Sequence, residues 1–132
     1  MGTLTLETSS VRVAIVDDHE AVRLGFAGMC SSSDLELVGE AATVREIISK
    51  INGRECQVVV MDLSLADGSL VTENVSQLVA AGSAVLIYSI ADKANLMRMA
   101  IRAGAVAIVP KSRPMAYLAE VIRLAADGAI IN

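Results

Sequence analysis

Five polar residues stand at the ends of short apolar runs, where side chains that bind ligands or react are often found in α/β proteins. They are two adjacent carboxylates, a third carboxylate, a hydroxyl and an amine: Asp17, Asp18, Asp62, Ser89 and Lys111. Any one of these residues alone is more often a turn residue, a helix cap or a surface group. Their joint occurrence at separate run ends favours a shared chemical role.

The chemistry available to this set is metal binding and phosphoryl transfer. Three carboxylates in one place repel one another, which is tolerable at neutral pH mainly when a cation sits among them. Carboxylate oxygens favour a hard ion such as Mg²⁺, which prefers octahedral geometry. A carboxylate beside Mg²⁺ and a lysine can be a ligand only, or a nucleophile toward a phosphoryl group whose charge the two cations neutralise. Residue types alone leave both roles open for Asp62.

The apolar runs have the length and composition of buried β-strands. We predict five strands of four to seven residues each, Arg12–Val16, Leu35–Ala41, Val58–Met61, Ala84–Tyr88 and Val106–Val109. Strands that are apolar throughout indicate a parallel sheet covered on both faces. The segments between them show helical spacing of apolar residues, as in Val22, Phe26 and Met29 and again in Leu118, Val121, Ile122 and Ala125.

Strands that alternate with helices predict one α/β domain. Glycines follow four of the predicted helices, where helix ends favour them, at Gly53, Gly82, Gly104 and Gly128. In an open parallel sheet, ligands bind outside the carboxyl ends of the strands, where the strand order reverses. The five polar residues should therefore meet at one rim of the sheet.

Size and composition exclude several classes of function. The chain has 132 residues, enough for one domain with a full core. Apolar residues make up 54%, but no run approaches the roughly 18 residues of a membrane span, so we expect a soluble, cytoplasmic protein. A net charge of −4 opposes direct binding to nucleic acid phosphates. Cys30 and Cys56 have no metal-like spacing and are interpreted as reduced structural thiols.

Several motifs, in order along the chain, resemble the receiver domain of bacterial two-component response regulators. They are VDDH at Val16–His19, MDLSLADGS at Met61–Ser69, RAGA at Arg102–Ala105 and the lysine that follows the last predicted strand. Their spacing is also similar to that of the family, with 44 residues from Asp18 to Asp62 and 22 from Ser89 to Lys111. The stretches VDDHEAVRLGF and VGEAAT resemble the NarL/FixJ group more specifically.

The resemblance implies a flavodoxin-like (βα)5 fold, a doubly wound five-stranded parallel sheet with strand order 2-1-3-4-5, over residues 11–132. Residues 1–10 would be a flexible lead. The domain would be a signalling module and not an enzyme: a sensor histidine kinase would phosphorylate it, and it would control a transcriptional output domain. Because the chain ends just after the last predicted helix, we expect the native protein to continue into a helix-turn-helix DNA-binding domain. A homodimer is also expected, through a helix face that periodicity does not identify.

The resemblance also implies a magnesium site. Asp18 and Asp62 would bind Mg²⁺ directly, together with the backbone carbonyl of Ser64. Asp17 would act through a bound water.

Three residues would handle the phosphoryl group. Asp62 would be the phosphoacceptor. Lys111 would pair with Asp62 and then with the phosphoryl oxygens, and Ser89 would donate its hydroxyl once the group is in place. The charge change would then bias the loop after Ser89 and the helix that follows it.

Four positions depart from the family pattern. Ala66 and Glu20 each stand where proline is common, and Pro110 fixes the chain just before Lys111. Ile108 occupies the position of an aromatic residue that moves inward on activation, and isoleucine has no ring to rotate. Tyr88 is not expected to replace it, because neighbouring strand residues face opposite ways. We predict intact phosphorylation chemistry with atypical coupling to the output.

The remaining alternatives fit less well. A phosphatase of the haloacid dehalogenase type needs a second aspartate two residues after the first, where this chain has Ser64 after Asp62 and His19 after Asp17. His19, the lone histidine, is interpreted as structural or capping. A cobalamin-binding domain needs a glycine at the position of Val22, and no glycine-rich nucleotide motif occurs. The main alternative is a receiver that signals without phosphorylation, through dimerisation or a small ligand.

Overall fold

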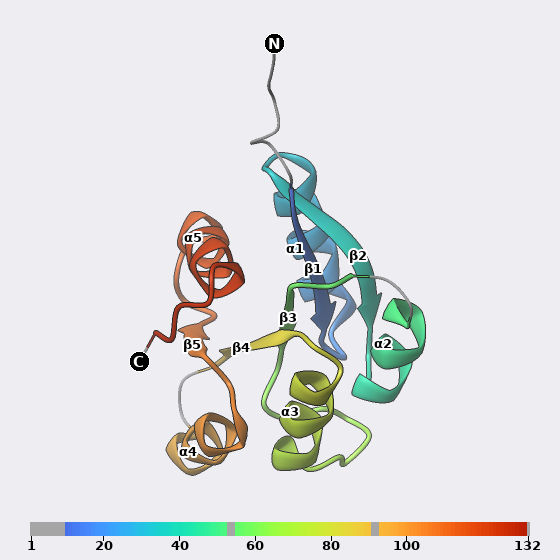
Figure 1. Cartoon of the computed structure of the whole chain (residues 1–132), viewed down its shortest axis with the longest axis vertical. Coiled ribbons are helices and arrows are strands. Elements are labelled where there is room, and N and C mark those ends of the chain that lie inside the picture. Colours follow the sequence, from blue (N-terminus) through green and yellow to red (C-terminus); the bar gives the residue numbers. More distant parts are fainter. Residues whose placement is uncertain (1–9, 53–54, 91–92, 132) are drawn as a thin grey trace.

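The fold is an alternation of five strands with five helices (Figure 1). The computed structural model describes residues 10–52, 55–90 and 93–131. The predicted flexible lead lies outside the described residues except for Ser10, and so does Gly53. In chain order the elements are β1 Val11–Val16, α1 Glu20–Ser31, β2 Leu35–Ala41, α2 Val44–Ile51, β3 Val58–Met61, α3 Val71–Ala80, β4 Ala84–Ser89, α4 Ala94–Ala103, β5 Ala107–Pro110 and α5 Met115–Ala126.

The five strands form one parallel sheet in the order β2-β1-β3-β4-β5. This order confirms the predicted doubly wound fold. The order reverses between β1 and β3, which pair from Val13 with Val58 to Val16 with Met61. The residues that follow β1 and β3 therefore lie side by side at the point where ligands of such sheets bind.

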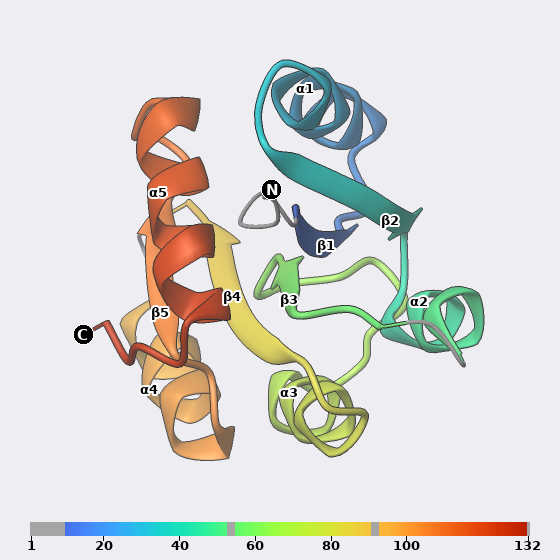
Figure 2. The ribbon, with the colours of Figure 1, turned by 45° about the horizontal axis from the view of Figure 1, so that its top comes forward.

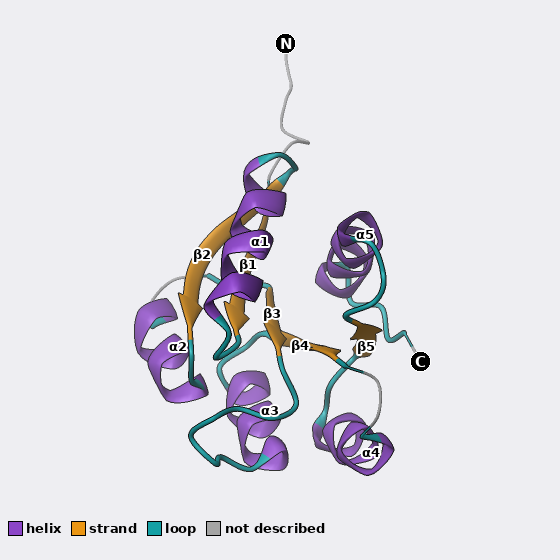
Figure 3. Ribbon diagram, turned by 180° about the vertical axis from the view of Figure 1, so that it is seen from behind, coloured by secondary structure: helices purple, strands orange, loops and turns teal. Residues whose placement is uncertain are grey.

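Helices cover both faces of the sheet, as the apolar strands predicted. On one face, α1 and α5 pack against side chains such as Val13, Ile15 and Val60, and Figure 3 shows α1 lying over β1 and β2. On the other face, α2, α3 and α4 pack against alternate residues such as Val16 and Met61. Figure 2 shows α2 and α3 on the opposite side of the strands from α1. None of the described helices has the length and hydropathy to span a bilayer.

The predicted strand limits agree with the structure to within one residue. Leu35–Ala41 and Val58–Met61 are confirmed as predicted. The fourth strand extends to Ser89, and the fifth is shifted by one residue and ends at Pro110. A proline without an N–H is tolerated there, because β5 is an edge strand.

Two glycines are needed for the packing of α2 and for the end of α4. A Cβ on Gly39 of β2 would lie 3.1 Å from Cδ1 of Ile47, so the missing side chain lets α2 approach the strand closely. Gly104 follows α4 with φ 121°, a conformation that L side chains rarely adopt, and its N–H bonds to the carbonyl of Ile101. This confirms the prediction that Gly104 ends its helix.

Candidate functional site

Backbone hydrogen bonds carry the sheet past the ends of its strands and fix the polar residues there. The N–H of Asp17 donates to the carbonyl of Ala41 at 3.0 Å, and that of Asp62 donates to the carbonyl of Val16 at 3.1 Å. At the other side of the rim, the N–H of Lys111 donates to the carbonyl of Ser89 at 2.9 Å. The carboxylates and the lysine are thus presented by a rigid frame.

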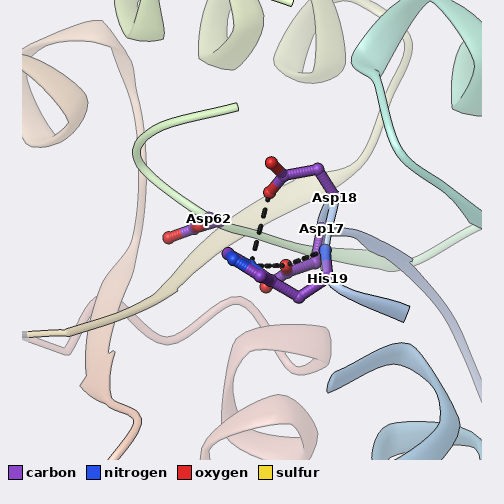
Figure 4. A group of neighbouring side chains, drawn as sticks. All are labelled: Asp17, Asp18, His19 and Asp62. Carbon is purple, nitrogen blue, oxygen red and sulfur yellow. Dashed lines mark hydrogen bonds and ion pairs between the residues drawn. The ribbon is translucent and has the colours of Figure 1, made fainter. Parts of the chain in front are cut away.

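The carboxylates form a compact cluster with His19 (Figure 4). One potential ligand atom from each of Asp17, Asp18, His19 and Asp62 lies within 4.8 Å of all the others. Asp17 is 1% exposed and Asp62 8% exposed, so two of these carboxylates are largely removed from water. The structure therefore brings together the three aspartates that the sequence analysis assigned to one rim.

The cluster fits a hard metal ion. Among the described residues, Oδ1 of Asp18 is a buried side-chain oxygen with no hydrogen-bond partner, and its contact with His19 Nδ1 at 3.5 Å is at ion-pair distance only. A buried carboxylate oxygen is costly unless something satisfies it. Carboxylate oxygens are the type of donor that Mg²⁺ and similar hard ions prefer.

Lys111 lies between two of the carboxylates. Its Nζ donates to Oδ2 of Asp17 at 2.9 Å and lies 3.7 Å from Oδ2 of Asp62. Lys111 was predicted to pair with Asp62, whereas its ammonium lies closer to Asp17. Asp17 is the more deeply buried carboxylate, so it gains more from a short, charge-assisted bond.

The environment of Asp62 raises the pKa of its carboxyl. Burial is the largest cause, because it disfavours the charged form, and the neighbouring charge of Asp17 acts in the same direction. Lys111, the N–H of Leu63 and the hydroxyl of Ser89 act in the opposite direction. The N–H of Leu63 donates to Oδ1 of Asp62 at 2.9 Å and so orients the carboxylate.

Asp62 faces a hollow of about 320 Å³. This volume is large enough for a phosphoryl group and part of its donor. The hollow is also lined by three other predicted residues, Ser64, Ser89 and Lys111. Its full lining is His19, Asp62, Ser64, Ser89, Ile90, Lys93 and Lys111. The Ser89 hydroxyl donates to the carbonyl of Ile90 at 3.2 Å.

His19 supports the carboxylate cluster. It precedes α1 as the N-cap residue, and its side chain makes no capping hydrogen bond. Instead, its Nδ1 lies 3.1 Å from Oδ1 of Asp17, and its N–H donates to the same oxygen at 2.9 Å. The interpretation of His19 as structural or capping stays a prediction, because its ring nitrogen also belongs to the group of atoms that could hold a metal ion. Glu20 is exposed at the start of α1.

Two basic residues of the site were missed by the sequence analysis. Arg23 on α1 donates from Nη1 to the carbonyl of Asp17 at 2.6 Å and from Nε to Glu40 at 3.2 Å. Its place one helical turn after His19 is a signal that could have identified it. Lys93 donates from Nζ to Oγ of Ser64 at 2.8 Å. This contact joins two loops, so no periodic pattern in the sequence predicts it.

Ile108 and Tyr88 lie on opposite faces of the sheet. Ile108 packs with α4 on the face covered by α2, α3 and α4, where it lines a shallow apolar hollow with Met97 and Ile101. Tyr88 is buried on the face of α1 and α5, with its ring centroid 5.8 Å from Nζ of Lys111. This agrees with the expectation that Tyr88 does not replace an aromatic residue at position 108.

Comparisons with known proteins place the site in context. Residues 13–123 match the sequence model of the response regulator receiver domain. The transcriptional regulatory protein UhpA of Salmonella typhimurium is 35% identical over 124 residues, which are 92% of this chain and 62% of that relative. The transcriptional regulatory protein LiaR of Bacillus subtilis is 30% identical over 121 residues, 89% of this chain and 57% of LiaR. The chain thus spans about three fifths of the length of these relatives.

Solved structures have the same fold. A two-component response regulator of the LuxR family from Aurantimonas sp. SI85-9A1 superposes with a TM-score of 0.81 at 28% identity, covering 92% of this chain and 89% of that one. The signal receiver domain of the putative response regulator NarL from Mycobacterium tuberculosis also reaches 0.81 at 23% identity, covering 91% and 98%. The second likeness bears on the fold alone.

Proposed function

Since this chain belongs to the response regulator receiver domain family of two-component systems, we propose that Asp62 is its phosphoacceptor. The observation that carries the proposal is the position of Asp62. Its carboxylate lies at the switch point of the sheet, within reach of Lys111 and beside two further aspartates, and faces an open hollow.

The proposed donor is the phosphohistidine of a sensor histidine kinase. An oxygen of Asp62 attacks the phosphorus atom, and the bond between phosphorus and the imidazole nitrogen breaks. The electron pair stays on that nitrogen, which takes up a proton from solvent. The receiver itself needs to transfer few protons. Catalysis therefore depends on positioning the reacting groups and on neutralising the charge of the phosphoryl oxygens.

Asp17, Asp18, Asp62 and the backbone carbonyl of Ser64 are the proposed Mg²⁺ ligands, with Asp17 acting through water. When bound, the ion would supply positive charge against the oxygens of the transferring group. The buried Oδ1 of Asp18, which accepts no hydrogen bond, supports this assignment. Arg23 and His19 hold the backbone and side chain of Asp17 in place for the same purpose.

Lys111 and Ser89 are the proposed phosphoryl-binding side chains. Lys111 has its ammonium within 3.7 Å of Asp62, so a phosphoryl group on that residue would enter its field. Ser89 lies on the same hollow and has a hydroxyl that can rotate toward a new acceptor. Together they would bind the oxygens that the transfer adds.

The partners of the full-length protein are part of the same proposal. UhpA and LiaR are transcriptional regulatory proteins, and this chain matches only part of each. We therefore propose that a DNA-binding output domain completes the regulator, that it acts in the cytoplasm, and that a homodimer forms in its active state. Ile108 offers no aromatic ring for the usual switch, so coupling from the site to the output would run through other contacts of α4.

Phosphorylation by a small donor tests the acceptor assignment. The protein is incubated with Mg²⁺ and acetyl phosphate, and its intact mass is compared with that of Asp62→Asn. Asp67→Asn is a matched control, because Asp67 lies in the same loop but is exposed and bonded to Ser69. We expect a phosphoryl adduct on the wild type and on Asp67→Asn and none on Asp62→Asn. An unmodified wild type would overturn the acceptor assignment and favour a receiver that signals without phosphate.

A further inference from the structure

We infer that Lys93 is a second phosphoryl-binding cation of the Asp62 hollow, held on Ser64 until a phosphoryl group arrives. This inference rests on the proposed function, because it concerns the same acceptor. It adds a phosphoryl-binding residue that comes from the segment just before α4, whereas Asp62 and Lys111 follow β3 and β5.

The contact that identifies Lys93 joins two loops. Lys93 immediately precedes α4, whereas Ser64 follows β3 by three residues. The Lys93 ammonium donates to the Ser64 hydroxyl at 2.8 Å, and both residues line the hollow that Asp62 faces. The side chain of Lys93 is thus directed toward the acceptor side of the molecule and not away from it.

The two lysines of the hollow differ in how firmly they are held. Lys111 is 17% exposed and donates to the buried carboxylate of Asp17 at 2.9 Å, a charge-assisted bond. Lys93 is exposed and donates to a neutral hydroxyl. Because a bond from an ammonium to an anionic oxygen is stronger than one to a neutral hydroxyl, a phosphoryl group on Asp62 would compete successfully with Ser64 for Lys93.

The charge of the hollow favours this transfer. The three clustered aspartates already face one tightly paired lysine, and a phosphoryl group adds more negative charge at Asp62. The exposed ammonium of Lys93, which lines the hollow, would neutralise part of that negative charge. It would also stand in the path of water, whose oxygen must bond to phosphorus as the bond to Asp62 breaks, releasing the carboxylate and inorganic phosphate.

Lys93 also connects the hollow to α4. Its carbonyl accepts the hydrogen bond from the N–H of Met97 at 3.0 Å, so its backbone forms the first turn of the helix. A side chain that moves from Ser64 to a phosphoryl oxygen would therefore act on the start of α4 directly. This route needs no aromatic residue at Ile108.

Fluoroberyllate, which binds phosphoacceptor carboxylates as a phosphoryl mimic, tests the inference. Its affinity in the presence of Mg²⁺ is measured for the wild type, Lys93→Ala, Lys93→Gln and Lys93→Arg. Arg98→Ala is the matched control, since Arg98 is an exposed cation one turn further along α4 that bonds to Asn95 and does not line the hollow. The rate of phosphoryl loss after reaction with acetyl phosphate is measured on the same proteins.

We expect Lys93→Ala and Lys93→Gln to weaken fluoroberyllate binding about fivefold, the scale of a partly exposed charge contact. They should also lose the phosphoryl group faster, whereas Lys93→Arg and Arg98→Ala stay close to the wild type. Glutamine can keep the bond to Ser64 without the charge, so wild-type behaviour of Lys93→Gln would show a bridge between loops and overturn the inference. Wild-type behaviour of Lys93→Ala would overturn it as well. A wild type that binds no fluoroberyllate at all would instead refute the proposed function, and the inference with it.

Discussion

Replacing Asp62 with asparagine is expected to make the metal-free protein more stable at neutral pH. Asp62 is 8% exposed, and one of its oxygens lies within 4.8 Å of a carboxylate oxygen of Asp17. At an effective dielectric constant of about 20, two like charges at that separation repel by about 3.5 kcal/mol. Lys111, at 3.7 Å, attracts Asp62 by about 4.5 kcal/mol on the same scale.

These two contributions nearly cancel, so the cost of removing the carboxylate from water decides the sign. That cost is several kcal/mol for a buried ion, and the hydrogen bond from Leu63 offsets part of it. Asparagine carries no charge and keeps a side-chain oxygen that can accept the same bond. We expect Asp62→Asn to raise the free energy of unfolding by about 1 to 2 kcal/mol, the part of the desolvation cost that remains.

The pH dependence has a definite sign. The folded state raises the pKa of Asp62 above its ordinary value of 3.8, so the folded protein holds this proton more tightly than the unfolded chain does. Stability from this residue is therefore lost as the pH rises through that range. The gain in free energy of unfolding from Asp62→Asn should be absent below about pH 3. It should be fully present at pH values above the pKa of Asp62 in the folded protein.

Urea unfolding in the presence of a chelator measures this difference directly. Asp67→Asn is the control, because hydrogen bonds from Ser69 lower the pKa of Asp67 and its charge should favour the folded state. Saturating Mg²⁺ should reduce or reverse the difference in free energy of unfolding between the wild type and Asp62→Asn, because the ion is proposed to bind the Asp62 carboxylate. Equal or lower stability of Asp62→Asn in chelator at neutral pH would refute the electrostatic reasoning.

Three further predictions concern Lys111, Asp18 and the two cysteines. Lys111→Ala should lower the free energy of unfolding by about 3 kcal/mol, because it removes the lysine that pairs with the buried carboxylate of Asp17; a loss below about 1 kcal/mol in urea titrations would contradict this. Asp18→Asn should weaken Mg²⁺ binding at least about tenfold in calorimetric titrations, since loss of a group that merely supports a metal ligand already costs about 10- to 100-fold in affinity, and an unchanged Kd would exclude Asp18 as a ligand. Burial raises the pKa of Cys30 to about 11, so Cys30 and Cys56 should react slowly with a thiol reagent until the protein unfolds; rapid reaction of the folded protein would show that the thiols are accessible.

The strands and the convergence of the acidic residues could be predicted because simple physical rules determine them. Val58–Met61 is fully buried, so it must be apolar throughout, and that pattern is visible in the sequence. A parallel sheet then brings the residue after each strand to the same edge, which places Asp17 beside Asp62. The resemblance to the receiver family added the order of the strands, which periodicity does not contain.

Side-chain partners within the site were harder to predict. The preference of Lys111 for Asp17 over Asp62 depends on differences in burial and distance that only the folded structure shows. The contact of Lys93 with Ser64 depends on the paths of two loops, which have no repeating pattern. The end of β5 at Pro110 reflects its place at the sheet edge, a consequence of topology and not of local propensity.

The central claim is that Asp62 becomes an acyl phosphate. The direct measurement is borohydride reduction of the protein after reaction with acetyl phosphate and Mg²⁺, followed by proteolysis and mass spectrometry of the fragment that contains Asp62. Borohydride reduces acyl phosphates and leaves free carboxylates unchanged. The account predicts one reduced side chain, at Asp62, with none when Mg²⁺ is removed. Reduction at another residue, or at none, would contradict it.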